Sequence, residues 1–579
     1  MEIQTLNPTT PRHRHRIETF LQQNGLRLDT LDYYAVVVDE STDELIAGGG
    51  LDRNVIKCVA VADAHKGEAI ANTLVSHLIA HANAEGYTSI KLFTKPENRR
   101  LFESLSFRLL AEAPKAILME TGIGGIATVE SALKSIATAH PSTSHNGAIV
   151  MNCNPFTLGH RYLIEQAAQR VAWLYVIVVR EDCSLFSYEE RKAMVEQGTA
   201  HLPNVVVVDG SDYAISRTTF PTYFLKRLDD AADTQMLLDL DLYRRHIAPA
   251  LNVTTRFVGT EPSDALTRRY NQLMRATLTA VSEIHRCTHE GKAVSASLVR
   301  KAMDDGDMRT IRQLVPPSSL PYIIAHLATN ALQAELDTTP KPGLVDRHDN
   351  GAHHDMDYAL MQHSIRALHP YFVQLATLGF AATLPQHTDI QRIGINAEQA
   401  MFRATNGVNT HKGALFSMGL AVVASAHAEH EHCPLDTIAH TIRAIASAFP
   451  DTKDTHGSKA RQLAEQGNTI KGALDNARDG YETLFQAWLP YYITHRNAHD
   501  PYALHKTLLR IMCDLDDTNV IYRTGIATAS EVKNEAVALL NDFSEEALTE
   551  MNQRYTALNV SPGGAADMLS LTVFCSNFY

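Results

Sequence analysis

The chain has 579 residues, of which 45% are hydrophobic and 20% charged, a composition typical of folded globular proteins that excludes a largely disordered or fibrous chain. Lys and Arg number 52 against 65 Asp and Glu, and the net charge of −13 argues against a general nucleic-acid binder or a binder of anionic membranes. There is no apolar run of the roughly 18 residues that a membrane span needs. No signal peptide is visible, and the seven cysteines form no CxxC pair, so we expect a cytoplasmic protein with reduced thiols.

Two polar, proline-containing stretches, residues 138–146 and 315–321, are typical of linkers. We therefore expect three domains, at residues 1–140, 147–318 and 322–579. The first two alternate strand-like and helix-like runs, which favours α/β folds, with a doubly wound parallel sheet in the second. The third has long apolar stripes at helical spacing and almost no alternating runs, so we expect it to be mainly α-helical.

The first domain is expected to have strands at Tyr34–Val38, Lys57–Val61 and Ser89–Phe93, and a helix over Ala69–Glu85. In the second domain strands and helices alternate along the chain. These elements are Ala148–Met151, Tyr162–Ala172, Leu174–Val179, Glu189–Ala200 and Val205–Val208.

The first strand of the second domain ends in a loop, after which Thr157-Leu158-Gly159-His160 opens a helix. Ligands of open parallel sheets bind beyond the carboxyl ends of the strands, and the amides and dipole of a helix start attract phosphate. Gly159 lets the backbone approach a ligand closely, and His160 can donate a ring proton to a phosphate oxygen. The alternative is a helix cap at Thr157 beside an incidental histidine.

A second hydroxyl-rich helix start, Ser295-Ala296-Ser297, is followed one turn later by Arg300. Together these groups can form a second phosphate cradle. The pair of motifs resembles the nucleotidyltransferase superfamily, with an HxGH-like first motif and an ISxSxxR-like second one. That resemblance implies attack on an α-phosphate with pyrophosphate leaving, catalysed by positioning and charge neutralisation.

Longer stretches make the resemblance more specific: CNPFTLGHRYLIE, REDCSLFSYEER, GSDYAISRTTFPTYFLK, VGTEPSDALTRRYNQLM and VSASLVR. In combination they resemble the citrate lyase ligases over about residues 1–318, a family that carries an acetyltransferase-like amino-terminal domain. The resemblance implies ATP-dependent acetylation of a thiol on the acyl carrier subunit of citrate lyase. Acetate would react through acetyl-adenylate, with AMP and pyrophosphate released.

The resemblance assigns catalytic roles to His160 and Thr157, and Thr157 stands where the superfamily usually has its first histidine. We therefore expect Thr157 to hydrogen-bond phosphate without transferring a proton. The other implied ATP-binding residues are Asn154, Phe156, Gly159, Ser295, Ser297 and Arg300. Further candidates for acetate, carrier or phosphate, with surface solvation as the alternative, are Arg217, Lys226 and Arg268.

The first domain departs from the acetyltransferase pattern. Its loop around Lys66 resembles the family's pyrophosphate loop, but Ala64 replaces Arg or Gln, and Ser106 stands where Gly is common. We therefore expect this domain to bind a pantetheine arm or the carrier, without an acetyl transfer of its own.

The third domain places carboxylates where apolar residues are expected. Glu335 falls on the same helical stripe as Leu332, and a carboxylate in a core is costly unless it is paired or liganded. In the run LLRIMCDLDDTNVIYRTG, Asp516 is expected to project with Met512, leaving Asp517 nearer the flank. A buried salt-bridge cluster is the alternative, but the nearby NTHKG stretch favours a site for Mg²⁺ and phosphate.

Four ordered stretches, TPKPGLVDRHDNGAHHDMD, NGVNTHKGALFSMGLA, DDTNVIYRTG and SPGGAADML, resemble triphosphoribosyl-dephospho-CoA synthases over roughly residues 322–579. The resemblance implies that the 2′-hydroxyl of dephospho-CoA attacks the anomeric carbon of the ATP ribose and displaces adenine. The candidate bases or Mg²⁺ ligands are Asp346, Asp355 and Asp516. The candidate phosphate ligands are Lys341, Lys412 and Arg523, and the candidate Mg²⁺ ligands are Glu335, Asp516 and Asp517.

Together the resemblances imply a bifunctional enzyme of citrate lyase maturation that uses ATP, acetate, the acyl carrier subunit and dephospho-CoA. Two alternatives for the ligase half are a phosphopantetheine-type adenylyltransferase and a carrier-binding scaffold with decayed sites. The synthase half could also serve malonate decarboxylase, which uses a closely related prosthetic-group precursor.

Overall fold

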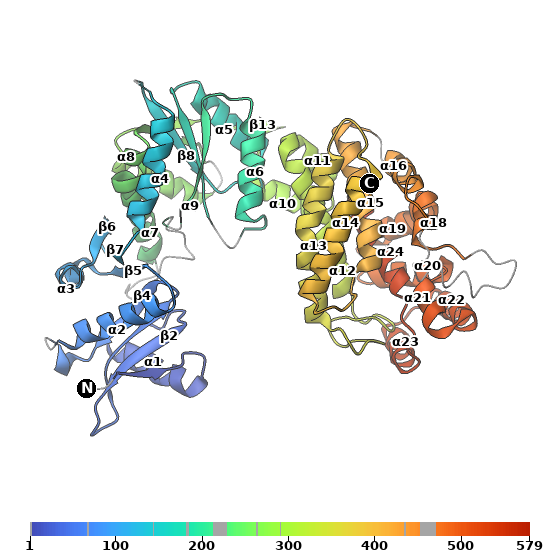
Figure 1. Cartoon of the computed structure of the whole chain (residues 1–579), viewed down its shortest axis with the longest axis horizontal. Coiled ribbons are helices and arrows are strands. Elements are labelled where there is room, and N and C mark those ends of the chain that lie inside the picture. Colours follow the sequence, from blue (N-terminus) through green and yellow to red (C-terminus); the bar gives the residue numbers. More distant parts are fainter. Residues whose placement is uncertain are drawn as a thin grey trace. The chain divides into compact units, whose positions relative to one another are not determined.

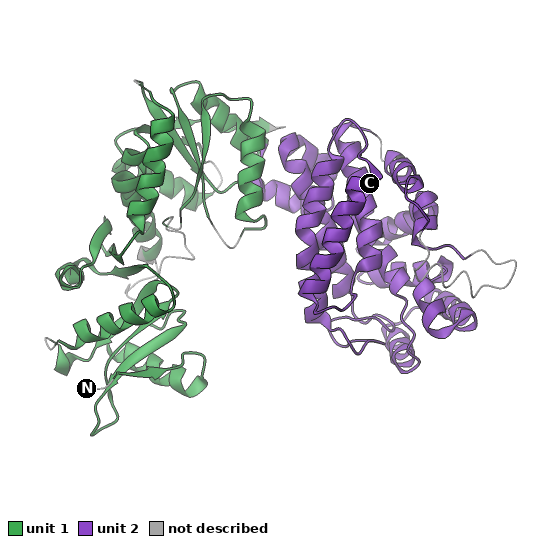
Figure 2. Cartoon of the chain, viewed as in Figure 1, with its two compact units in different colours: residues 1–154, 158–294 green, residues 155–157, 295–579 purple. Residues whose placement is uncertain are grey.

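The computed structural model describes residues 3–66, 69–142, 144–180, 184–211, 213, 229–261, 264–289, 291–433, 436–451 and 470–579. The chain forms two compact units, which Figure 2 colours separately. Unit 1 comprises residues 1–154 and 158–294, and unit 2 comprises residues 155–157 and 295–579. Within the described ranges, no helix is long and apolar enough to cross a membrane.

Unit 1 begins with a seven-stranded sheet in the order β1-β2-β3-β4-β5-β7-β6 (Figure 1). Its strands are β1 (Ile3–Leu6), β2 (Tyr33–Val38), β3 (Leu45–Asp52), β4 (Val55–Val61), β5 (Ser89–Thr94), β6 (Arg108–Ala113) and β7 (Ala116–Gly122). Neighbouring strands are antiparallel except for β4 and β5, which are parallel and pair at two positions. The helices are α1 (Pro11–Gln23), α2 (Ile70–Ala84) and α3 (Arg99–Ser104), and short 3-10 turns lie at Asp63–His65 (η1) and Pro96–Asn98 (η2).

The strand β3 was not predicted, because its centre is the glycine run Gly48–Gly50. These glycines are required by the neighbouring strand. A Cβ on Gly48 would lie 2.5 Å from the hydroxyl of Tyr34, and one on Gly50 would lie 2.7 Å from the carbonyl oxygen of Tyr33. Ser106 keeps the left-handed backbone (φ 67°) that glycine favours at such positions.

The helix α4 (Ile126–Ala139) leads to a five-stranded parallel sheet in the order β10-β9-β8-β11-β12. The strands are β8 (Asn146–Met151), β9 (Leu174–Val178), β10 (Val205–Asp209), β11 (Val253–Gly259) and β12 (Val281–Ile284). The helices are α5 (Leu158–Ala168), α6 (Tyr188–Thr199), α7 (Asp229–Leu242), η3 (Tyr243–Ile247), α8 (Ala248–Ala250) and α9 (Ala265–Thr277), and a small hairpin of β13 (Thr288–His289) and β14 (Lys292–Ala293) follows. The predicted doubly wound parallel sheet is confirmed.

The chain builds this sheet outward from β8 in two directions, first to β9 and β10 and then to β11 and β12. The strand order therefore reverses between β8 and β11. In sheets of this type the crevice outside the carboxyl ends of the strands, at this reversal, is the usual ligand site.

Unit 2 is helical from α10 onward, as predicted. Its first half contains α10 (Ala296–Asp304), α11 (Met308–Leu314), η4 (Pro317–Ser319), α12 (Leu320–Asp337), α13 (Tyr358–Gly379), α14 (His387–Ala404), α15 (Lys412–His430) and α16 (Asp436–Ser447). The second half contains α18 (Ala473–Arg478), η5 (Leu484–Trp488), α19 (Leu489–Asn497), α20 (Ala503–Asp514), α21 (Thr518–Thr524), α22 (Ile526–Asn541), α23 (Glu545–Ala557) and α24 (Gly563–Ser576). The three helices α12, α15 and α24 pack on one another and are buried on nearly all sides, so they form the core of the unit.

Two helix predictions need correction. The helix expected over Tyr162–Ala172 is α5, which begins at Leu158, as the TLGH tetrapeptide indicates, and ends at Ala168 instead of Ala172. The helix expected to run through Asp516 is interrupted: α20 ends at Asp514 and α21 begins at Thr518.

Candidate functional sites

The loop after β8 in unit 1 is held by a buried arginine. Arg191 is fully buried, and its guanidinium donates to the carbonyl oxygens of Asn152 (2.8 Å), Val179 (2.8 Å) and Phe186 (3.1 Å) and to the side-chain oxygen of Asn152 (2.6 Å). Asn154 also belongs to this network, because its Oδ1 accepts from the amide of Phe186 (3.1 Å). The segments that follow β8 and β9 are thereby fixed beside each other at the carboxyl edge of the sheet.

His160 lies half-buried in the first turn of α5, at the carboxyl edge of the sheet. Burial, and then the positive charge of Arg286, lower its pKa to about 4. The imidazole is therefore neutral at pH 7 and can donate one hydrogen bond. Gly159, beside it, is in the same turn, so a phosphate that reaches this helix start meets backbone amides and one ring N–H.

Two arginines lie at the same edge, after β11 and β12. Arg286 forms an ion pair with Glu261, and its amide donates to the hydroxyl of Thr260 (3.1 Å). Arg268 donates to the carbonyl oxygen of Glu261 (3.1 Å). A direct role of Arg268 toward acetate, carrier or phosphate stays a prediction, and Arg217 and Lys226 lie outside the described residues.

The second phosphate motif begins α10, in unit 2. Ser295 caps this helix: its Oγ accepts from the amide of Leu298 (3.3 Å) and lies 2.9 Å from Oγ of Ser297. Arg300 is half-buried one turn further along. The predicted contacts of these groups with ATP remain predictions.

Three residues of the first motif, 155–157, belong to the helical unit. Phe156 and Thr157 are buried, and the carbonyl oxygen of Phe156 accepts a hydrogen bond from the hydroxyl of Ser319 (2.8 Å). Along the sequence, the first motif therefore contains residues of both units.

In unit 2, a cluster of buried charged side chains surrounds Lys341. This lysine is 1% exposed, its ammonium group is paired with Glu335 of α12, and its amide donates to Asp346 (2.9 Å). Asp346 also accepts from the amides of His348 (2.7 Å) and Asp349 (3.2 Å), so it organises the loop after α12. The structure therefore brings together three residues that the sequence analysis selected.

Two residues of this cluster were not predicted. His411, 4% exposed, contacts Ser364 through Nδ1 (2.8 Å), while its buried Nε2 has no hydrogen-bond partner. Burial, and then the charge of Lys341, lower its pKa to about 3. Asp567 of α24 is half-buried and packs against Gly413, where a Cβ would lie 2.1 Å from its carboxylate. Burial and the carboxylates of Asp517 and Glu335 raise the pKa of Asp567 well above its usual range.

Asp517, and not Asp516, points into this cluster. Asp517 is buried and caps α21, accepting from the amides of Asn519 (2.9 Å) and Val520 (3.3 Å), and it accepts from Ala565 (2.9 Å) in the first turn of α24. Burial raises its pKa. Asp516 is half-exposed and paired with Lys533 (2.6 Å). The prediction that Asp516 projects with Met512 was wrong, because the helix ends before it.

The remaining predicted residues of the synthase half have other partners. Lys412 is exposed and paired with Glu398 (2.6 Å). Arg523 is exposed and donates to the carbonyl of Ala352 (3.2 Å) and to Asn559 (3.0 Å). Asp355 is exposed. Within the described part of the chain, no group of three or more His, Cys, Asp or Glu side chains has a metal-binding arrangement.

Three protein-family models match successive parts of the chain. The model of the citrate lyase ligase C-terminal domain matches residues 146–323, that of the ATP:dephospho-CoA triphosphoribosyl transferases matches residues 321–578, and that of the acetyltransferase (GNAT) family matches residues 2–107. The acetyltransferase-like fold predicted for the first domain is thereby confirmed.

Curated relatives cover each half almost completely. The citrate (pro-3S)-lyase ligase of Klebsiella pneumoniae is 39% identical over 320 residues, 54% of this chain and 92% of its own length. The ligase of Escherichia coli K12 is 40% identical over 53% of this chain and 89% of its own. The 2-(5''-triphosphoribosyl)-3'-dephosphocoenzyme-A synthase of Pectobacterium atrosepticum is 37% identical over 42% of this chain and 85% of its own. The chain therefore belongs to the citrate lyase ligase family through its amino-terminal half and to the triphosphoribosyl-dephospho-CoA synthase family through its carboxy-terminal half.

Proposed function

We propose that this chain carries out two steps in the maturation of citrate lyase. The carboxy-terminal half makes the precursor of the prosthetic group from ATP and dephospho-CoA, with release of adenine. The amino-terminal half acetylates the thiol of the finished group on the acyl carrier subunit, using ATP and acetate. The observation that carries this proposal is that nearly the whole length of a relative from each family lies in one polypeptide.

In the ligase reaction an acetate oxygen attacks the α-phosphorus of ATP and pyrophosphate leaves; the carrier thiolate then attacks the acetyl carbon and AMP leaves. The neutral His160 donates a hydrogen bond to a phosphate oxygen, and Thr157 does the same without transferring a proton. The second motif, Ser295, Ser297 and Arg300, neutralises phosphate charge. Asn154 and Phe156 hold the loop through their hydrogen bonds with Phe186 and Ser319. Gly159 lets the backbone approach the phosphate closely.

In the synthase reaction the 2′-hydroxyl of dephospho-CoA attacks the anomeric carbon of the ATP ribose, and the bond to adenine breaks. Asp567 is our choice for the group that accepts the hydroxyl proton, because it lies in the cluster, where burial and the carboxylates of Asp517 and Glu335 raise its affinity for a proton. Lys341 is suited to the triphosphate, because it is the basic side chain inside the cluster. The earlier candidates Asp355 and Asp516 are less suited, because they lie outside it.

The donor set of the cluster fits Mg²⁺. Three interacting carboxyl groups, Glu335, Asp517 and Asp567, stand against the single lysine, and burial is the chief cause of the raised pKa of each. Mg²⁺ is commonly held by one or two carboxylates together with substrate phosphates, so a larger group of protein ligands is not required. The ion would supply charge neutralisation for the triphosphate; Glu335 and Asp517 are the residues that would hold it.

Product analysis with the full chain tests both halves. Pyrophosphate release that needs acetate and the reduced carrier together supports the ligase. Release with a phosphopantetheine-type phosphate alone would support an adenylyltransferase, and no release would indicate a scaffold. Adenine release from ATP that begins only when dephospho-CoA is added supports the synthase. Comparing the carrier subunits of citrate lyase and malonate decarboxylase as acetyl acceptors identifies the client.

A further inference from the structure

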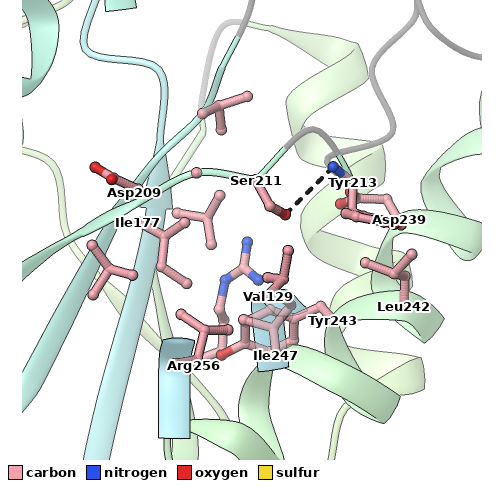
Figure 3. Close-up of a pocket in the computed structure, with 15 residues that line it drawn as sticks. Val129, Ile177, Asp209, Ser211, Tyr213, Asp239, Leu242, Tyr243, Ile247 and Arg256 are labelled. Atoms are coloured by element: carbon pink, nitrogen blue, oxygen red, sulfur yellow. Dashed lines mark hydrogen bonds between the residues drawn. The ribbon is translucent and has the colours of Figure 1, made fainter. Parts of the chain in front are cut away.

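A small cavity lies against one face of the parallel sheet in unit 1, where α4, α7 and η3 cover it (Figure 3). Its volume is about 50 Å³, which leaves room for a few water-sized groups. A molecule the size of acetate fits such a space, whereas a nucleotide does not. Most of the lining is aliphatic, contributed by Val129, Leu133, Val150, Ile177, Val208 and Leu242.

The exception in this lining is Arg256, in the middle of β11. It is 4% exposed, and its guanidinium points into the space between the lining side chains (Figure 3). The group lies over the ring of Tyr243, 4.3 Å from the centroid, and its Nε has no hydrogen-bond partner. No carboxylate among the described residues lies within ion-pair distance of it. Tyr243, Tyr270 and, without a direct ion pair, Asp239 compensate its charge, so an anionic ligand would give it the direct partner that it lacks.

The two acids in the lining already have other partners. Asp239 accepts from the hydroxyl of Tyr270 (2.5 Å), and Asp209 is bound by Lys192 (2.6 Å) and Tyr188 (2.8 Å). Asp239 acts on the guanidinium electrostatically, with Tyr270 between them. Beside these two engaged acids and a few hydroxyl-bearing side chains, the lining offers one buried positive charge and mainly aliphatic side chains, a pattern that suits a short monocarboxylate.

The cavity also lies at the ligand-binding end of the sheet. Its rim includes Gly210 and Ser211, which follow β10, and Val179, which follows β9. Arg256 pairs with Ala148 of β8, so it stands at the reversal of strand order described above. The His160 helix begins at the carboxyl end of the same β8 strand.

We propose that this cavity binds the acetate of the ligase reaction, with the carboxylate on the guanidinium of Arg256 and the methyl group against the aliphatic lining. The inference rests on the proposed ligase function and adds to it the place and the size limit of the acid. It predicts that the enzyme accepts acetate and discriminates against longer acids through the walls of this cavity.

The first test replaces the cation in the full chain. For Arg256→Lys and Arg256→Met, initial rates of acetate-dependent pyrophosphate release are measured at varied acetate and varied ATP. We expect the KM for acetate to rise about 10- to 100-fold, the range for loss of a hydrogen-bonded charged partner, while the KM for ATP stays unchanged. A folded variant with an unchanged acetate KM would overturn the inference.

The second test changes the size of the cavity and does not depend on how the arginine variants fold. Val129→Ala shortens a side chain of the lining and so enlarges the cavity. We expect the ratio of kcat/KM for propionate to that for acetate to rise about tenfold. The matched control is Val207→Ala, a half-buried β10 valine that does not line the cavity and is expected to leave the ratio unchanged. Equal ratios in both variants would overturn the inference.

The two tests separate this inference from the function on which it rests. If the wild-type chain releases no pyrophosphate with acetate and carrier, the ligase proposal fails. If the wild type is active but neither the arginine variants nor Val129→Ala alters acid kinetics, the ligase proposal stands and the acetate site is elsewhere.

Discussion

The parallel-sheet part of unit 1 and the helical unit 2 assemble their anion-binding groups in different ways. In the sheet, Arg191 ties loop carbonyls together so that a helix start and the neutral His160 lie at the carboxyl edge. In the helical unit, the charged groups Glu335, Lys341 and Asp517 lie inside the core. The first arrangement uses backbone that any strand and helix provide; the second requires charged side chains to be buried.

The difference teaches where each site is vulnerable. A sheet-edge site can lose one side chain while the fold remains, because the amides and the helix start do not depend on it. A site inside a helical core couples function to folding, because each charge there offsets another one. The predictions below compare the two regions by that criterion, starting with the largest effect.

We expect Lys341→Met to give the largest effect. The substitution leaves Glu335 buried without its cation, which typically costs about 3–5 kcal/mol of unfolding free energy. Adenine release is expected to disappear as well, while acetylation of the carrier persists. Thermal unfolding and both product assays measure this. Lys412→Met is the control: its exposed pair with Glu398 contributes less than about 1 kcal/mol. Equal melting of the two variants would remove the distinction.

The corresponding change at the sheet edge is His160→Ala. We expect acetate-dependent pyrophosphate release to fall about 10²- to 10³-fold, or roughly 2.7–4 kcal/mol in barrier, which is typical for the loss of one hydrogen-bond donor to a developing charge. Melting and adenine release should stay close to wild type. A loss of both activities would contradict the independence of the two sites.

The unusual pKa of His411 gives a pH dependence. Its folded-state pKa of about 3 lies below the ordinary 6.5. Between these two pH values the histidine is protonated in the unfolded chain and neutral in the folded chain. Stability is therefore lost as the pH falls from 6.5 toward 3, by roughly 1.4 kcal/mol per pH unit, or about 2 kcal/mol at pH 5. Asp567 has the opposite sign, because a raised acid pKa removes stability as the pH rises.

The effect of His411 is isolated by comparing wild type with His411→Asn in denaturant unfolding at pH 5 and pH 7. The difference in unfolding free energy between the two proteins should shift by about 2 kcal/mol in favour of the variant at the lower pH. If the difference in unfolding free energy between the two proteins were the same at pH 5 and pH 7, the ring of His411 would not be held neutral in the folded chain.

The last prediction compares two neighbouring carboxylates, of which Asp516 is expected to give the smallest effect on adenine release. Asp517→Asn should reduce adenine release strongly, because it weakens a buried Mg²⁺ candidate that also accepts from Ala565. Asp516→Asn should change it little, because that side chain is half-exposed and pairs with Lys533. Steady-state rates with dephospho-CoA measure both. The reverse order would restore Asp516, the residue that the sequence favoured.

The sequence predicted the elements whose pattern is local. The run Leu174–Val178 was predicted as a strand from its own β-branched and aromatic residues. Glu335 was found because it is a carboxylate on an otherwise apolar helical stripe. The strand β3 was missed because glycine is rare in strands, and the reason for Gly48 is the side chain of Tyr34 on the neighbouring strand β2, which leaves no room for a Cβ. A local pattern carries no record of such a partner.

The helical site was predicted in part for the same reason. Lys341 and Asp346 lie close to Glu335 along the chain, whereas His411 and Asp567 come from the starts of α15 and α24 and meet the cluster through tertiary packing. Both lie in stretches that the resemblance included, NTHKG and SPGGAADML, so a search of those stretches for buried polar residues could have found them. Asp517 was named as a candidate Mg²⁺ ligand but placed nearer the helix flank, because the predicted helix was extended through the turn between α20 and α21.

The hydrogen bond from Ser319 to the carbonyl of Phe156 has a consequence for genetic dissection. A gene fragment that starts at Ser295 encodes all of unit 2 except residues 155–157, and its product would bury the Ser319 hydroxyl without this acceptor. Cutting the chain before Ser295 is therefore expected to lower the stability of the isolated unit 2. The halves of this fusion share three residues of chain, and a clean separation would have to supply them in trans.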